Sequence, residues 1–164
     1  MDDAPPPVDL QLVEAEDARA LAAVGTLFQE YADGLGVDLS FQGFDRELRG
    51  LPGAYAPPGG ALWLARRGGH AIGCVALKAL EPPQVAEMKR LYVRPEGRGL
   101  GLGRRLAEAA IDHARRKGYA RLRLDTLPSM GQAHALYLAL GFRAIAPYRF
   151  NPVPGAQFLE LALS

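Results

Sequence analysis

The sequence has a single cysteine, Cys74, among 164 residues. One cysteine excludes an internal disulfide and any metal site that needs several thiolates. The three histidines, His70, His113 and His134, are scattered and show no metal-ligand spacing. We therefore expect no metal. Cys74 lies in the apolar run 71–77, where a packed strand residue is expected rather than a nucleophile.

Long apolar runs and a surplus of one charge are missing as well. No apolar stretch approaches the ~20 residues that span a bilayer. The net charge of +1 creates no field that would recruit nucleic acid or an anionic membrane. The first residues are acidic and proline-rich, without the basic and apolar segments of a secretion signal. We expect a cytoplasmic protein that binds neither nucleic acid nor membrane.

The length and the residue balance fit one domain. Hydrophobic residues make up 49% of the chain and charged residues 23%, as in ordinary globular proteins. No internal repeat and no linker divides the sequence. We expect residues 1–7 to be a disordered lead-in and residues 8–164 to form a single domain.

Hydrophobic patterns predict strands and helices along most of the chain. Strands are predicted at residues 8–13, 61–65, 71–80, 85–93, 121–126 and 157–163. Helices are predicted at residues 17–33, 41–51, 101–117 and 130–140, the first of them capped by Asp17. Strands and helices alternate after residue 84, which favours an α/β fold with a mixed sheet.

The most informative segment joins the strand 85–93 to the helix 101–117. Its residues are Arg98, Gly99, Leu100, Gly101, Leu102, Gly103 and Arg104. Glycine at alternate positions lets backbone N–H groups approach a bulky anion, at a helix N-terminus whose partial positive charge attracts it. The arginines of this segment and Arg105 add forked donors that suit phosphate oxygens. Charge and geometry together indicate a pyrophosphate.

The glycine spacing alone does not identify the ligand. A dinucleotide fingerprint has the pattern G-x-G-x-x-G near the first strand of a βαβ unit, whereas these glycines follow G-x-G-x-G late in the chain. A Walker loop needs G-K-[ST], and here Arg104 follows Gly103. A strand-to-helix turn without any ligand and another nucleotide-binding module both stay open at this point.

Two segments resemble one family. Arg98–Gly103 matches the [QR]-x-x-G-x-[GA] acetyl-CoA loop of the GNAT superfamily of N-acetyltransferases, after the usual strand end Leu91–Pro95. Ala133–Phe142 is similar to the second block of the superfamily, A-x-x-L-Y-x-x-x-G-F. The resemblance implies a single-domain GNAT-type α/β fold. Its mixed, mostly antiparallel sheet would have six to seven strands, flanked by about four helices, with a splayed central strand pair.

The resemblance also implies a reaction. An acetyl group would move from acetyl-CoA to a primary amine by direct attack in a ternary complex, without a metal. Tyr137 would point its hydroxyl at the thioester sulfur, although its place on an apolar helix face also suits a core tyrosine. The residues expected to bind the cosubstrate are Leu91, Tyr92, Val93, Arg98, Gly99, Leu100, Gly101, Leu102, Gly103, Arg104, Ala133, Leu136 and Tyr137.

A general base must first take a proton from the amine, because ammonium has no lone pair. Strict alternation along 85–93 places Glu87 on the same strand face as Leu91 and Val93. If those two residues line the cofactor cleft, Glu87 points there too, and it is the predicted base. The competing interpretation is a surface carboxylate paired with Lys89 or Arg90.

The sequence constrains the identity of the acceptor amine less than that of the cosubstrate. In this superfamily the amino-terminal helices wall the acceptor site, and here they offer aromatic residues such as Tyr31 and Phe44. Lys89, Arg90 and Arg149 nearby would suit a small amine that also carries a carboxylate. A polyamine, an antibiotic or a protein terminus stays open, and so does a homodimer. A non-catalytic CoA or acyl-CoA sensor would keep the glycine loop and lack turnover.

Overall fold

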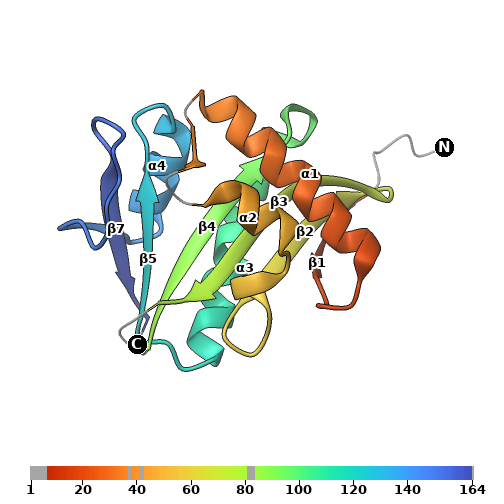
Figure 1. Cartoon of the computed structure of the whole chain (residues 1–164), viewed down its shortest axis with the longest axis horizontal. Coiled ribbons are helices and arrows are strands. Elements are labelled where there is room, and N and C mark those ends of the chain that lie inside the picture. Colours follow the sequence, from red (N-terminus) through yellow and green to blue (C-terminus); the bar gives the residue numbers. More distant parts are fainter. Residues whose placement is uncertain (1–6, 37, 41–42, 81–83, 164) are drawn as a thin grey trace.

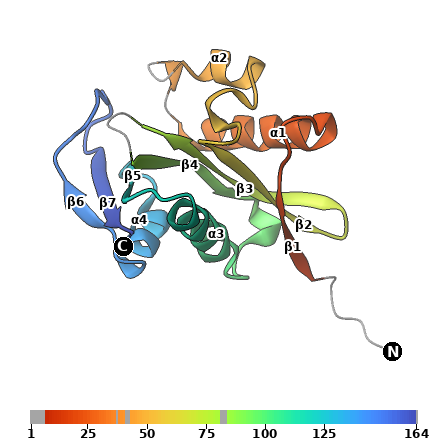
Figure 2. The ribbon, with the colours of Figure 1, turned by 90° about the horizontal axis from the view of Figure 1, so that it is seen from below.

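The computed structural model describes residues 7–36, 38–40, 43–80 and 84–163. The predicted disordered lead-in therefore lies outside the described residues, apart from Pro7. Residues 41 and 42, at the start of the second predicted helix, lie outside them too. The described chain forms one open sheet with helices on both faces (Figures 1 and 2).

Seven strands of the described chain make this sheet, in the order β1-β2-β3-β4-β5-β7-β6. All neighbours are antiparallel except β4 and β5. The strands are β1 (Val8–Leu12), β2 (Ala61–Arg67), β3 (His70–Ala79), β4 (Val85–Val93), β5 (Arg121–Thr126), β6 (Arg143–Ile145) and β7 (Gln157–Ala162). The mixed, mostly antiparallel sheet is confirmed. The sequence pattern misses β6, because three residues are too few to show alternation.

Four α-helices of the described chain cover the sheet: α1 (Ala18–Leu35), α2 (Phe44–Arg49), α3 (Leu102–Arg116) and α4 (Gly131–Ala139). Helices α1 and α2 lie over one face, and α3 and α4 over the other (Figure 2). The N-cap of α1 is as predicted, since Asp17 Oδ1 accepts a 3.0 Å hydrogen bond from the backbone N–H of Ala20. Short 3₁₀ turns lie at Gly53–Tyr55 and Pro95–Gly97.

The sheet separates two apolar cores. Trp63, Leu106 and Phe142 belong to the core on the α3 face, and Phe28 and Cys74 belong to the core on the α1 face. Cys74 is completely buried, as expected for a packed strand residue, and burial raises the pKa of its thiol. A thiol in this environment is not a reactive nucleophile.

Strands β4 and β5 diverge after a short paired segment. Val85–Glu87 pairs with Arg121–Arg123, and no pairing between the two strands is described beyond it. Strand β5 stays paired with β7 along its whole length. The remainder of β4, from Met88 to Val93, therefore has an open edge toward β5, and the two arrows separate in Figure 1. The predicted splayed strand pair is confirmed.

A β-bulge interrupts β4 within this open stretch. Ala76 of β3 lies opposite Lys89, whereas Cys74 lies opposite Tyr92. Two steps along β3 thus correspond to three along β4, and Arg90 adopts a φ of 60°. A bulge of this kind inserts one residue and shifts the alternation of side chains beyond it.

The bulge overturns the predicted common face of Glu87, Leu91 and Val93. Ala86 and Met88 belong to the α3-side core, so Glu87 between them points to the opposite face, which carries α1 and α2. Beyond the bulge, Leu91 and Val93 pack against the α3-side core. The same-face prediction is wrong, because the inserted residue moves the two-residue period by one position.

Candidate active site

A groove of about 650 Å³ runs past the end of β4 and the start of α3. Most of the residues that the resemblance implied for cosubstrate binding line it: Leu91, Tyr92, Val93, Arg98, Gly99, Gly101, Leu102, Gly103, Ala133 and Leu136. Leu100 is not part of the lining and is 46% exposed. Arg104 is not part of it either, and its Nε pairs at 3.2 Å with Glu108 on the exposed side of α3.

The glycine loop presents the N-terminus of α3 to this groove. Gly99 and Gly101 have φ angles of 82° and 72°, a region in which side chains other than glycine are strained. Gly101 directly precedes α3, and no side chain caps this helix end. The first N–H groups of the helix are therefore available to an anion. Arg98 lies beside them and bonds through Nε to the carbonyl oxygen of Val93 at 3.2 Å, so these residues fit a pyrophosphate.

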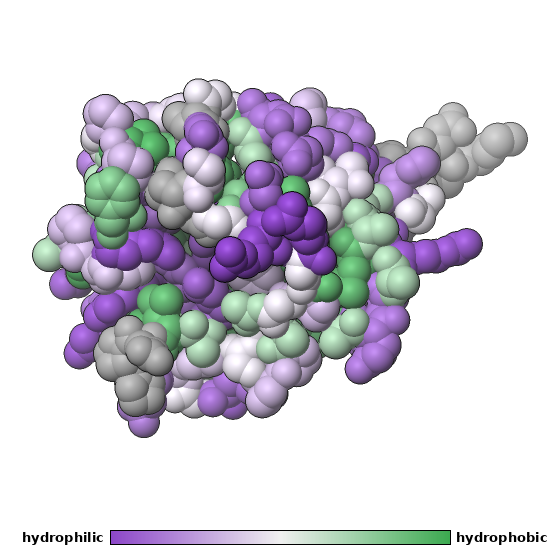
Figure 3. Space-filling view, viewed as in Figure 1, coloured by the Kyte–Doolittle hydropathy of each residue, from purple (hydrophilic) through white to green (hydrophobic). Residues whose placement is uncertain are grey.

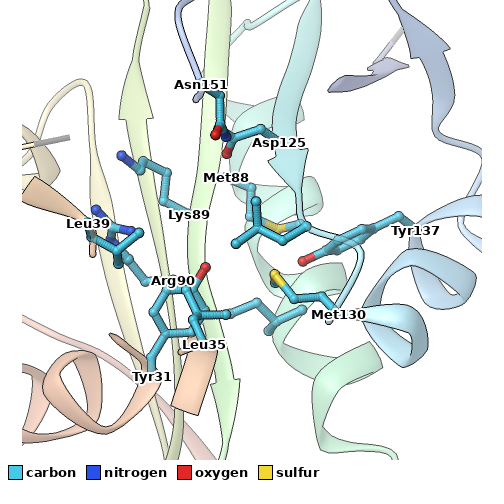
Figure 4. Close-up of a pocket in the computed structure, with 12 residues that line it drawn as sticks. Tyr31, Leu35, Leu39, Met88, Lys89, Arg90, Asp125, Met130, Tyr137 and Asn151 are labelled. Carbon is cyan, nitrogen blue, oxygen red and sulfur yellow. The ribbon is translucent and has the colours of Figure 1, made fainter. Parts of the chain in front are cut away.

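A narrow pocket of about 20 Å³ continues from the groove into the gap between β4 and β5. Tyr31, Leu35, Leu91 and Met130 line both spaces, so the groove and the pocket adjoin. Tyr137 lines the pocket, and Figure 4 shows its hydroxyl pointing inward from α4.

Tyr137 is held in a fixed position and keeps its proton. Its side chain is 4% exposed, and its ring packs against that of Phe142 with 5.7 Å between centroids. Burial raises the pKa of Tyr137, and Tyr31 and Asp125 act in the same direction. The phenol is therefore a proton or hydrogen-bond donor at neutral pH.

Glu87 lies outside the pocket lining, at the centre of a buried ionic cluster. Its side chain is completely buried, and Oε2 accepts a 2.7 Å hydrogen bond from the hydroxyl of Tyr148. The carboxylate also pairs with Arg149 and, at 3.9 Å, with Lys78. The competing interpretation, a surface carboxylate paired with Lys89 or Arg90, does not fit either, because Glu87 is buried and its ion-pair partners are Arg149 and Lys78.

Among the described residues that line the pocket, Asp125 is the one that carries a carboxylate, and Tyr137 lines the same pocket. Its Oδ2 accepts a 3.2 Å hydrogen bond from Nδ2 of Asn151 and lies 3.7 Å from Nε of Arg149. The sequence prediction omits Asp125. A signal was present, since Leu122 and Leu124 alternate into the core and leave Asp125 on the other strand face.

Arg90 fixes the bulge to α2. Its Nε and Nη2 donate to the two carboxylate oxygens of Glu47, each at 2.9 Å. The guanidinium carbon also lies 5.1 Å from the ring centroid of Phe44 and 5.8 Å from that of Tyr31. A forked ion pair and two aromatic contacts hold an arginine in a backbone conformation that it rarely adopts.

The outer surface over these residues is hydrophilic. Figure 3 shows the face that carries α1 and α2, with hydrophilic side chains gathered between α2 and β7.

In the described part of the chain, no group of three His, Cys, Asp or Glu side chains could hold a metal ion. No helix described here is long and apolar enough to cross a membrane.

Comparisons with known proteins agree with this geometry. The chain matches the model of the acetyltransferase (GNAT) family over residues 22–142. An uncharacterised N-acetyltransferase of Schizosaccharomyces pombe is 43% identical over 139 residues, which cover 84% of this chain and 85% of that protein.

Solved structures share the fold. A GNAT acetyltransferase of Staphylococcus aureus superposes with a TM-score of 0.79 at 19% identity, covering 96% of this chain and 100% of the other. An acetyltransferase of Salmonella typhimurium, solved with acetyl-CoA, superposes with a TM-score of 0.71 at 20% identity, covering 96% and 95%. With the motif blocks, the splayed sheet and the family model in agreement, the chain belongs to the GNAT family of acetyltransferases.

Proposed function

We propose that this protein transfers an acetyl group from acetyl-CoA to the primary amine of a small molecule, by direct attack in a ternary complex. One observation carries the proposal. The groove at the uncapped N-terminus of α3 adjoins the pocket that Tyr137 lines, and the two share four wall residues. A helix end suited to an anion and a proton donor thus lie in neighbouring spaces.

The chain's own groups suit each part of acetyl-CoA. Gly99, Gly101 and Arg98 suit the pyrophosphate through backbone N–H groups and a permanent positive charge. The open edge of β4 at Leu91–Val93 offers backbone donors and acceptors to the amides of the pantetheine arm. The thioester would then reach the pocket beside Tyr137.

The reaction needs two proton movements. The neutral amine attacks the carbonyl carbon, so that a C–N bond forms and the C–S bond breaks. Tyr137 gives its proton to the departing sulfur, and solvent restores it. Tyr137 keeps its proton at neutral pH, so the donor is in place before the bond breaks. No acyl-enzyme forms in this scheme.

The second proton leaves the amine, and a carboxylate accepts it directly or through water. The sequence pattern names Glu87 for this role. The contacts favour Asp125, because it lines the pocket whereas Glu87 is buried against Tyr148 and Arg149. We propose Asp125 as the base, with Glu87 holding Arg149 in place.

Acetyl transfer is tested with acetyl-CoA and a panel of small amines, by thiol release and by the mass of the product. Thermal shifts with CoA, ATP and NAD test the groove separately. We expect CoA at 100 times its Kd to stabilise the protein by about 2.7 kcal/mol, and ATP and NAD to do less. Stabilisation by CoA without transfer to any amine would identify a sensor, and a preference for ATP or NAD would identify a nucleotide-binding module.

Two further parts of the proposal concern the protein as a whole. We propose that it acts in the cytoplasm, which suits its single, buried cysteine. The homodimer remains a prediction, and sedimentation of the full chain tests it.

A further inference from the structure

Lys89 is a buried cation without a partner among the described residues. It lines the pocket, and its side chain is 8% exposed. Three cations near Lys89 each reach a carboxylate: Arg90 pairs with Glu47, and Arg149 and Lys78 pair with Glu87. No such pair, and no hydrogen bond, is formed by Nζ of Lys89 within the described chain.

The charges around the pocket leave one positive charge unbalanced. Beside the pairs of Arg123 with Glu160 and of Arg94 with Glu30, four cations lie near three carboxylates: Lys78, Lys89, Arg90 and Arg149 against Glu47, Glu87 and Asp125. Each carboxylate is already bonded or paired. The surplus charge therefore belongs to Lys89, on the pocket wall.

An unpaired buried ammonium destabilises the free protein, and its titration reflects this. Burial lowers the pKa of Lys89 to about 7, and Arg90 and Lys78 act in the same direction. Glu47 and Asp125 act against them without restoring the ordinary value. A ligand that brings one negative charge into the pocket would restore the missing pair.

We propose that Lys89 binds a carboxylate of the acceptor, so that the acceptors are small amines that also carry a carboxylate, as amino acids do. This inference rests on the function proposed above. A single unpaired cation matches a carboxylate, whereas a phosphate ester would bring nearly two negative charges.

The pocket has complementary groups for both ends of such a molecule. Lys89 of β4 and Asp125 of β5 both line the pocket, and in Figure 4 the Lys89 amine lies to the left of β4 whereas the Asp125 carboxylate and Tyr137 lie to its right. Lys89 holds the acceptor carboxylate, and Asp125 faces its amine. The remaining wall is apolar, formed by Leu35, Leu39, Met88, Leu127 and Met130. The pocket of about 20 Å³ holds only the end of an acceptor, so its carbon skeleton would extend along Leu35 and Met130 into the larger groove.

Paired acceptors test this assignment. Each of L-leucine, L-methionine and L-phenylalanine is compared with its carboxamide, under saturating acetyl-CoA. We expect kcat/KM to favour the acids by about tenfold or more, as a charge-assisted contact provides. This preference runs against intrinsic reactivity, because the amine of a carboxamide is less basic and more of it is free at neutral pH.

Substitutions of Lys89 then test whether this side chain causes the preference for acids over carboxamides. Lys89→Met should raise KM for the acids about tenfold and leave the carboxamides and the KM for acetyl-CoA unchanged. Lys89→Arg keeps the charge and should keep the preference for acids. Lys117→Met removes the same charge from the exposed end of α3 and should match the wild type.

Two results would overturn the inference: transfer to amines with no preference for acids, or an equal loss for acid and carboxamide in Lys89→Met. If Lys89→Met fails to fold, the ratio of kcat/KM for the acids to kcat/KM for the carboxamides, measured in the wild type and in Lys89→Arg, still tests the inference. Failure of the proposed function gives a different result from failure of this inference, because the wild type would then transfer acetyl to no amine at all.

Discussion

Tyr148 donates a 2.7 Å hydrogen bond to Oε2 of Glu87, a carboxylate with no exposed surface. Burial raises the pKa of Tyr148, and a nearby Asp125 acts in the same direction, so this hydroxyl stays a donor. The bond ties the segment before β7 to the middle of the sheet. Arg149, the next residue, bridges Glu87 to Asp125. Glu87 therefore orders the acidic side of the pocket through its contacts.

Substituting the two carboxylates separates these roles. Asp125→Asn should lower kcat by about 10²-fold or more at neutral pH, with recovery as pH rises because free amine becomes abundant. Glu87→Gln should instead destabilise the fold by about 3 kcal/mol, since Arg149 and Lys78 lose their buried counter-charge. Thermal melts and pH–rate profiles of both variants measure this. Slow turnover at neutral pH that recovers with rising pH in Glu87→Gln would restore Glu87 as the base.

Tyr137→Phe removes the proposed proton donor and keeps the ring against Phe142. We expect kcat to fall by about 10²-fold, with nearly unchanged affinity for acetyl-CoA. Tyr119→Phe is the matched control, because its hydroxyl bonds to the carbonyl oxygen of Gly59 and lies outside the pocket. Lower stability with normal turnover per folded molecule would mark Tyr137 as a core residue only.

Gly101→Val tests the glycine loop. A side chain at this left-handed position strains the backbone by about 1–2 kcal/mol and blocks the approach of phosphate to the start of α3. Gly118→Val supplies the control, because Gly118 has a φ of 88° and open space around it just beyond the other end of α3. Both variants should lose similar stability, and only Gly101→Val should lose affinity for acetyl-CoA in calorimetry. Equal affinities in the two variants would make the loop purely structural.

Arg98→Ala should weaken acetyl-CoA binding by about 1.5–3 kcal/mol, the contribution of a charge-assisted contact. The loss should shrink at high salt, because the side chain is exposed and its charge is screened. Arg104→Ala is the control and should bind acetyl-CoA like the wild type, because Arg104 pairs with Glu108 and does not line the groove. Identical binding by Arg98→Ala and the wild type would exclude the phosphate contact.

Lys89→Met should stabilise the ligand-free protein, because it removes a buried charge that lacks a partner. Each kcal/mol gained should raise Tm by about 2–4 °C. In the wild type, the folded-state pKa of about 7 lies below the ordinary value of 10.5. The unfolded chain then binds more protons between these values, so stability should rise with pH from about 7 toward 10 and stay constant below 7 as far as Lys89 is concerned. Thermal melts against pH should show this rise in the wild type and lose it in Lys89→Met.

The sequence by itself determined the local parts of this protein. The glycines before α3 and the arginine beside them predict an anion site, because backbone freedom and a helix N-terminus are properties of neighbouring residues. Strands 85–93 and 121–126 follow from their patterns with the bounds that the structure shows. The cap at Asp17 is equally local, since its bond reaches only three residues ahead.

Only the tertiary structure decided which side chains meet in the pocket. The bulge at Arg90 depends on the pairing of β4 with β3 and on the ion pair with the distant Glu47, neither of which a local pattern contains. Strict alternation therefore carried Glu87 to the wrong face. Asp125 reaches Tyr137 because β4 and β5 part after three paired residues. Such contacts join residues far apart in the chain, and a pattern of neighbours cannot encode them.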